Sequence, residues 1–130
     1  MDYDKKPDGY YNNIRYEMLK YLPDKVEKII EVGCGDGGFA KVVKDKTDAE
    51  VWGVEYVAEE AARAGKVIDR AFAGPIEENL HRLPDSNFEV AYFNDVLEHL
   101  ADPYKLLLNF RKKMAPVSYT HLTLPTIYSV

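Results

Sequence analysis

Short apolar runs alternate with helical patterns along most of this chain. Four runs have the length and the polar flanks of buried strands: Lys28–Gly33, Glu50–Glu55, Val67–Gly74 and Phe88–Asp95. Apolar residues at helical spacing follow each run, at Gly38–Lys46, Val57–Lys66, Ile76–Leu83 and Pro103–Met114, and precede the first run at Asn12–Pro23. Strands that alternate with helices predict an α/β fold, a Rossmann-like parallel sheet with helices on both faces.

Polar and small residues gather where the predicted strands end. Ligands of such folds bind at the carboxyl ends of the strands. We therefore expect four segments to converge on one crevice: Glu31–Gly38, Glu55, Gly74 and Asn94–Asp95. Glycine and proline mark three predicted helix ends. Gly38 is expected to begin the helix 38–46, Gly65 to close the helix 57–66 and Pro103 to begin the helix 103–114.

Composition narrows the class of protein. The 130 residues suffice for one domain, and the net charge of -5 makes nucleic acid an unexpected partner. The one basic cluster, Arg111–Lys113, ends a predicted helix, where cations complement the dipole. No run approaches the roughly 20 apolar residues of a membrane span, and the first residues lack an apolar signal region. These features predict a cytoplasmic protein without a membrane partner; they predict no oligomeric state.

Cysteine and histidine usage argues against a metal site. Cys34 is the single cysteine, which rules out an internal disulfide and a zinc site built from cysteines. The three histidines are scattered along the chain.

The last fourteen residues, Val117–Val130, break the alternation, because they lack a turn glycine and a clear period. One reading frame of a widely used sequencing-library adapter encodes Val-Ser-Tyr-Thr-His-Leu-Thr-Leu-Pro-Thr, which is identical to Val117 through Thr126. We therefore divide the chain into a native domain, residues 1–116, and a non-native tail of translated adapter, residues 117–130. Functional residues are not expected in this tail.

The stretch EVGCGDGGFA, Glu31–Ala40, fits two glycine patterns. Gly33, Gly35 and Gly38 form the G-x-G-x-x-G pattern of dinucleotide sites. Glu31, Gly33, Gly35 and Gly37 form E-x-G-x-G-x-G, which points to a different nucleoside ligand. Both patterns let the backbone approach a ligand and open a helix N-terminus towards it.

Two acidic residues flank this glycine loop. An acid at Glu31 would face a pyrophosphate unfavourably, whereas it suits the ammonium or the sulfonium of S-adenosylmethionine. Glu55 ends the second strand, 55 − 33 = 22 residues beyond Gly33. An acid at about that distance binds ribose hydroxyls in dinucleotide folds. Glu55 thus supports a nucleoside ligand without choosing between the two candidates.

Three segments together resemble the class I S-adenosylmethionine-dependent methyltransferases, small-molecule type. IIEVGCGDGGFA resembles their first motif, VWGVEYVAEEAARA their acidic second strand, and NDVLEHLADP the segment after the fourth strand. The resemblance runs from about Tyr11 to Pro116, with the motifs in the same order and spacing.

The resemblance implies a cofactor site made from the strand ends. It assigns the methionine side of S-adenosyl-L-methionine to Glu31, Gly33, Cys34, Gly35 and Gly37. It assigns the ribose and the adenine to Glu55, Tyr56, Gly74, Pro75 and Ile76, and the surroundings of the sulfonium to Asn94, Asp95 and Val96.

One position departs from the family pattern, and another matches it. The family usually has an acid after the third strand, where this chain has Pro75, so either backbone groups or Glu77 or Glu78 must serve the adenine. His99 falls at a histidine that is common in the large subgroup of the family whose segment after the fourth strand resembles NDVLEHLADP. It is a weak candidate for catalysis. No nucleophile–base pair stands out, which methyl transfer permits.

The implied function is methyl transfer from S-adenosylmethionine to an unidentified small-molecule acceptor. The residues leave two alternatives open: an NAD(P)-dependent oxidoreductase, and a non-catalytic nucleoside-binding module. The family's sheet has seven strands, of which we expect only the first four here. We therefore expect the 130-residue chain to bind the cofactor weakly and to methylate nothing.

We predict that the source gene departs from this sequence after Pro116 and continues with further strands. Sequencing the genomic locus checks this, and genomic codons for Val117–Val130 would contradict it.

Overall fold

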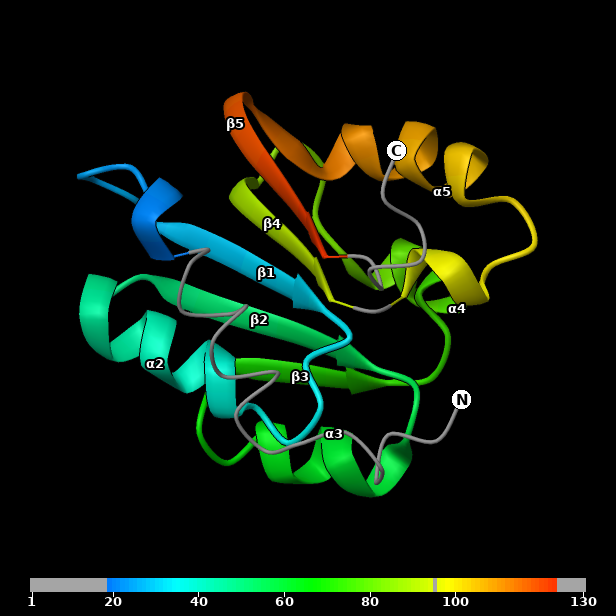
Figure 1. Cartoon of the computed structure of the whole chain (residues 1–130), viewed down its shortest axis with the longest axis horizontal. Coiled ribbons are helices and arrows are strands. Elements are labelled where there is room, and N and C mark those ends of the chain that lie inside the picture. The colour runs from blue at the N-terminus through cyan, green and yellow to red at the C-terminus, as the bar shows by residue number, and fades with distance from the viewer. Residues whose placement is uncertain (1–18, 95, 124–130) are drawn as a thin grey trace.

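A computed structural model describes residues 19–94 and 96–123 of the chain. It contains one parallel five-stranded sheet in the order β3-β2-β1-β4-β5 (Figure 1). The strands are β1 Lys28–Val32, β2 Glu50–Glu55, β3 Arg70–Ala73, β4 Phe88–Asn94 and β5 Met114–Thr123. Because every pairing is parallel, the carboxyl ends of the strands share one edge of the sheet.

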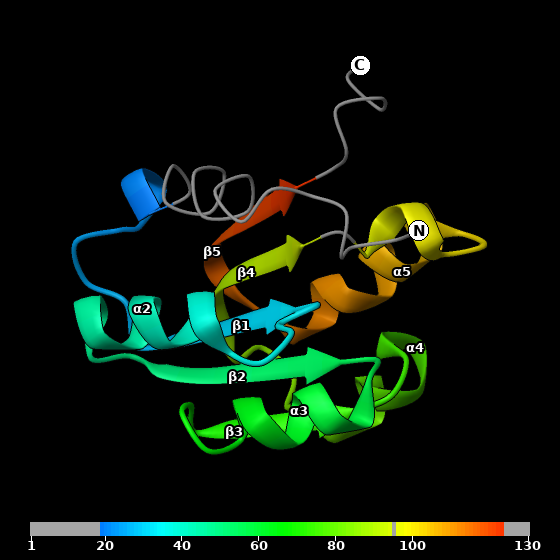
Figure 2. The ribbon, with the colours of Figure 1, turned by 60° about the horizontal axis from the view of Figure 1, so that its bottom comes forward.

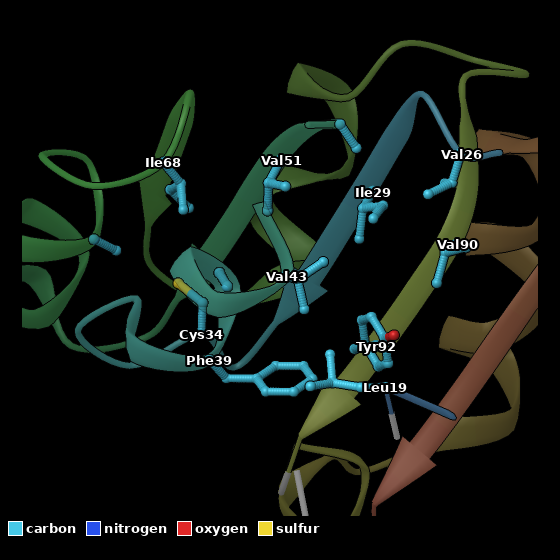
Figure 3. Close-up of a cluster of buried hydrophobic side chains, with 13 residues drawn as sticks. Leu19, Val26, Ile29, Cys34, Phe39, Val43, Val51, Ile68, Val90 and Tyr92 are labelled. Atoms are coloured by element: carbon cyan, nitrogen blue, oxygen red, sulfur yellow. The ribbon is translucent and has the colours of Figure 1, made fainter. Parts of the chain in front are cut away.

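Helices cover both faces of the sheet, as the alternation predicts (Figure 2). On one face lie α2 Gly38–Thr47 and α3 Ala58–Ala64; on the other lie α4 Ile76–Asn79 and α5 Pro103–Phe110. Each face of the sheet carries one cluster of buried hydrophobic side chains, the first under α2 and α3 and the second under α4 and α5. Successive residues of β1 point to opposite faces, so Ile29 packs in the first cluster and Ile30 in the second. Figure 3 shows the first cluster, where Phe39 of α2 meets Tyr92 of β4 edge-to-face at 5.1 Å between ring centroids.

Four 3-10 turns complete the described elements: η2 Leu19–Tyr21, η3 Leu80–Arg82, η4 Leu97–His99 and η5 Arg111–Lys113. Two of them take the last residues of predicted helices, because α4 and α5 tighten into η3 and η5. Most of the helix predicted at Asn12–Pro23 lies outside the described residues. Gly38 begins α2 and Pro103 begins α5, as expected; the Asp102 side chain caps α5 by accepting a hydrogen bond from the Lys105 amide at 3.0 Å.

The strand count differs from the expected four. Met114–Thr123 forms β5 and pairs with β4 from Phe88↔Met114 to Asn94↔Thr123, with a register shift between Phe88 and Val90. The pairing uses backbone groups, which any extended segment can offer to the open edge of β4. Residues 117–123, which we assigned to a tail, thus form most of a fifth strand. Its origin in translated adapter stays a prediction.

Gly33 marks the point where the loop after β1 passes the end of β4. A side-chain carbon at Gly33 would lie 2.4 Å from the Asn94 carbonyl oxygen and 2.6 Å from Cγ2 of Val96. The backbone there has φ +83°, which L-residues rarely adopt. Only glycine fits this contact, and the contact fixes the position of the loop.

We expect Gly33→Ala to lower the free energy of unfolding by about 2–5 kcal/mol, through the left-handed backbone and the clash with a carbonyl oxygen. Gly65→Ala is the matched control. Gly65 follows α3 with φ −60°, and its nearest atoms would be 3.6 Å from an added carbon. Urea unfolding of both variants measures the difference; equal stability of the two variants would contradict the assignment.

Candidate functional site

Backbone hydrogen bonds join the strand ends at the carboxyl edge of the sheet. The Gly33 amide donates to the Val54 carbonyl at 2.7 Å, which ties the loop after β1 to β2. The Gly74 amide donates to the Glu55 carbonyl at 2.9 Å, which ties the end of β3 to β2. With the contact between Gly33 and Asn94, the ends of four strands meet, as the sequence predicts.

The Glu55 carboxylate connects two loops at this edge. One oxygen accepts a hydrogen bond from the Gly35 amide at 2.9 Å, and the other accepts from the Val57 amide at 2.8 Å. A carboxylate has about four acceptor sites, so two remain beyond these two bonds. Glu55 is therefore already oriented and can still accept hydrogen bonds from a diol.

Glu31 brings a second carboxylate to the edge, and it is 1% exposed. The Asn94 amide nitrogen donates to Oε2 of Glu31 and links β4 to β1. Tyr92, paired with Glu31 across the two strands, is fully buried. Burial raises the pKa of the Tyr92 phenol, and the charge of Glu31 raises it further. The phenol therefore stays neutral beside the carboxylate.

Not every predicted residue offers its side chain to the edge. The Cys34 and Ile76 side chains are buried in the two cores, so only their backbones can contact a ligand. Gly37 has φ +89°, and a side-chain carbon added there would lie 2.8 Å from Cγ2 of Val67 and 3.0 Å from the Cα of Ala64, so its lack of a side chain serves helix packing. Asp95 lies outside the described residues.

Tyr56 is placed differently. It follows Glu55 directly, and the residue is 73% exposed. Val96 is partly buried and contacts the loop at Gly33.

Helix α4, which follows β3, ends in a buried residue that was not predicted from the sequence. Asn79 is 2% exposed and donates through Nδ2 to the carbonyls of Ala73 and Pro75, at 3.1 and 2.9 Å. These bonds hold the segment Gly74–Ile76 in place. The signal was present, because Asn79 stands three residues after Ile76 on the apolar face of a predicted helix.

Which group serves the adenine near Pro75 stays a prediction, but the positions of the candidates are clear. Strand β3 ends at Ala73, so Pro75 is the second residue after the strand. Glu77 and Glu78 lie in the first turn of α4 and are exposed. The arrangement leaves backbone groups at Gly74–Ile76 as the nearest to the strand end.

His99 follows β4 in the turn η4. Its side chain is 46% exposed, and its Nε2 atom lies 3.5 Å from Oε1 of Glu98, whose side chain is only 4% exposed. The burial of Glu98 could not be predicted from the sequence, because a single 3-10 turn has no apolar period.

These residues fit the cofactor that the family resemblance implies. Two carboxylates, Glu31 and Glu55, suit a ligand with a cationic sulfonium, an ammonium and a ribose diol. An added carbon at Gly35 would meet no atom within 4 Å, so the loop has room for a ligand beside its backbone. In residues 19–94 and 96–123, no group of three or more His, Cys, Asp or Glu residues could hold a metal ion. Among the same residues, no helix has the length and apolarity to cross a membrane.

Comparison with known proteins supports the same family. Residues 4–129 match the methyltransferase domain family. An uncharacterised methyltransferase of Schizosaccharomyces pombe is 32% identical over 117 residues, which cover 78% of this chain and 41% of the relative. Phosphoethanolamine N-methyltransferase 1 of Triticum aestivum is 26% identical over 118 residues, covering 84% of this chain and 24% of the relative. The chain thus spans less than half the length of either relative.

The solved structures agree on the fold. A SAM-dependent methyltransferase from Archaeoglobus fulgidus superposes with a TM-score of 0.70 at 20% identity, over 84% of this chain and 50% of that one. The fold, the glycine loop between two carboxylates and the family match lead to one assignment. The chain belongs to the S-adenosylmethionine-dependent methyltransferases.

Proposed function

We propose that this chain forms the cofactor-binding part of a methyltransferase that acts on a small-molecule acceptor. The observation that carries the proposal is the buried carboxylate of Glu31, two residues before Gly33 and bonded to Asn94. A buried negative charge at this place opposes a pyrophosphate and favours a cationic ligand.

The chain's residues would hold the cofactor in three parts. Glu55 would accept hydrogen bonds from the ribose hydroxyls through its remaining acceptor sites. The exposed ring of Tyr56 and the backbone of Gly74–Ile76 would flank the adenine. The loop from Glu31 to Gly37 would take the methionine part.

When bound, S-adenosylmethionine supplies an activated methyl group, whose bond to sulfur breaks with the electron pair staying on sulfur. The chain's own contribution is then to position the acceptor and to exclude water.

The acceptor class is proposed from similarity. One sequence relative is named as a phosphoethanolamine N-methyltransferase. That name describes an enzyme that methylates the amine of a small molecule. The relatives are longer than this chain, so recognition of the acceptor by the whole protein is part of the proposal. That the 130-residue chain alone turns nothing over stays a prediction, and a methylation assay beside the complete gene product tests it.

An NAD(P)-dependent oxidoreductase is the second candidate. It is favoured by one observation, since Glu55 ends β2 at the distance from Gly33 that dinucleotide sites use. Against it stand the buried Glu31 and the family match.

We predict that isothermal titration calorimetry detects binding of S-adenosylhomocysteine and none of NAD. Glu55→Gln should weaken that binding by about tenfold or more, because it removes charge-assisted hydrogen bonds to the ribose.

Glu27→Gln is the matched control, since Glu27 is exposed just before β1, at the opposite edge of the sheet. Circular dichroism confirms that both variants are folded. Binding of NAD in preference to S-adenosylhomocysteine would overturn the proposed function.

A further inference from the structure

The turn η4 places a carboxyl group that neither the fold nor the proposed cofactor site uses. In a 3-10 turn, side chains three residues apart eclipse each other. Leu97 and Leu100 accordingly both pack against the second core cluster. Glu98 comes from a different side of the turn, two residues beyond Val96, which contacts the glycine loop at Gly33. Glu98 thus follows the end of β4 by four residues, next to the segment that the family resemblance assigns to the surroundings of the sulfonium.

The Glu98 side chain is buried without adequate partners. It is 4% exposed, and both carboxyl oxygens are inaccessible to solvent. Within the part of the chain that the structure describes, neither oxygen makes a hydrogen bond. Among the described residues, the group that can carry an opposite charge beside it is the His99 imidazole, 3.5 Å away and charged only when it is protonated.

Such an arrangement costs stability. Buried ionised groups are normally paired and hydrogen-bonded, because burial removes their hydration without replacing it. A chain that keeps an under-satisfied carboxylate in the turn after β4 has a local conflict of the kind expected at functional positions. The half-exposed His99 gives this carboxylate a neighbour that solvent can reach.

We propose that Glu98 is the recognition group for an ammonium on the methyl acceptor. This inference rests on the proposed function and narrows its substrate class to amines. An ammonium has three donors, and it would supply both the opposite charge and the hydrogen bonds that Glu98 lacks. The carboxylate would select a cationic acceptor over a neutral one of the same size. One sequence relative carries the name of an N-methyltransferase, which agrees with an amine acceptor.

The first test is the thermal stability of the free chain. Glu98→Gln keeps the shape and removes the buried charge, so its Tm should rise by about 3 °C or more above the wild type. Glu27→Gln removes an exposed carboxylate and should leave Tm unchanged within about 1 °C. If the protonated His99 were instead the partner that Glu98 is buried for, Glu98→Gln would lower Tm, and the proposal would be wrong.

The second test uses a cationic probe. Ethanolamine hydrochloride should raise the Tm of the wild type saturably by about 2 °C or more, because a ligand that binds only the folded state stabilises it. Sodium chloride at the same concentration and ethylene glycol, a neutral probe of similar size, should not. The effect should vanish in Glu98→Gln and persist in Glu27→Gln. An equal shift in all three proteins, or no shift in the wild type, would overturn the proposal.

Calorimetry with S-adenosylhomocysteine separates this inference from the proposed function. Glu98→Gln should bind S-adenosylhomocysteine with the wild-type affinity. If S-adenosylhomocysteine binds but the ethanolamine effect on Tm does not depend on Glu98, only the acceptor proposal is wrong. If the ethanolamine effect on Tm depends on Glu98 but S-adenosylhomocysteine does not bind, only the proposed function is wrong.

Discussion

The parallel pairing of β1 with neighbours on both sides is the interaction on which the rest of this structure depends. Strand β1 pairs with β2 from Lys28↔Glu50 to Val32↔Val54, and with β4 from Ile29↔Val90 to Val32↔Phe93. Parallel pairing on both sides brings three strand ends to one edge, and residues 29–32 of β1 are buried. Glu31 is buried for this reason, and its charge is met by Asn94 from the neighbouring strand. The chemistry of the site is thus a consequence of strand order.

The central elements could be predicted from the sequence, whereas the margins could not. Strand β2 has the predicted bounds, because its apolar run is clear and it is paired on both sides. Strand β3, which has β2 as its one paired neighbour in the described sheet, is four residues long where eight were predicted. Strand β5 was missed, because its pairing depends on the backbone edge of β4 and not on a pattern of its own.

The site shows the same division. The convergence of Gly33, Glu55, Gly74 and Asn94 follows from their places at strand ends, and it could be predicted without coordinates. The contacts of the individual side chains could not be predicted. That Glu55 binds the amides of Gly35 and Val57, and that Glu98 is buried, depend on how loops close, which has no sequence period. The functions of the individual residues stay predictions until ligand binding is measured.

The inward orientation of Cys34 makes the glycine loop observable. Its thiol is fully buried, and its sulfur would lie 2.6 Å from a side-chain carbon added at Gly53 of β2. Cys34 is also the single cysteine of the chain. A thiol reagent can therefore react only when the loop detaches from the sheet, so the alkylation rate measures how often that local opening occurs. The residue that packs the loop against the core therefore also reports on the motion of the loop.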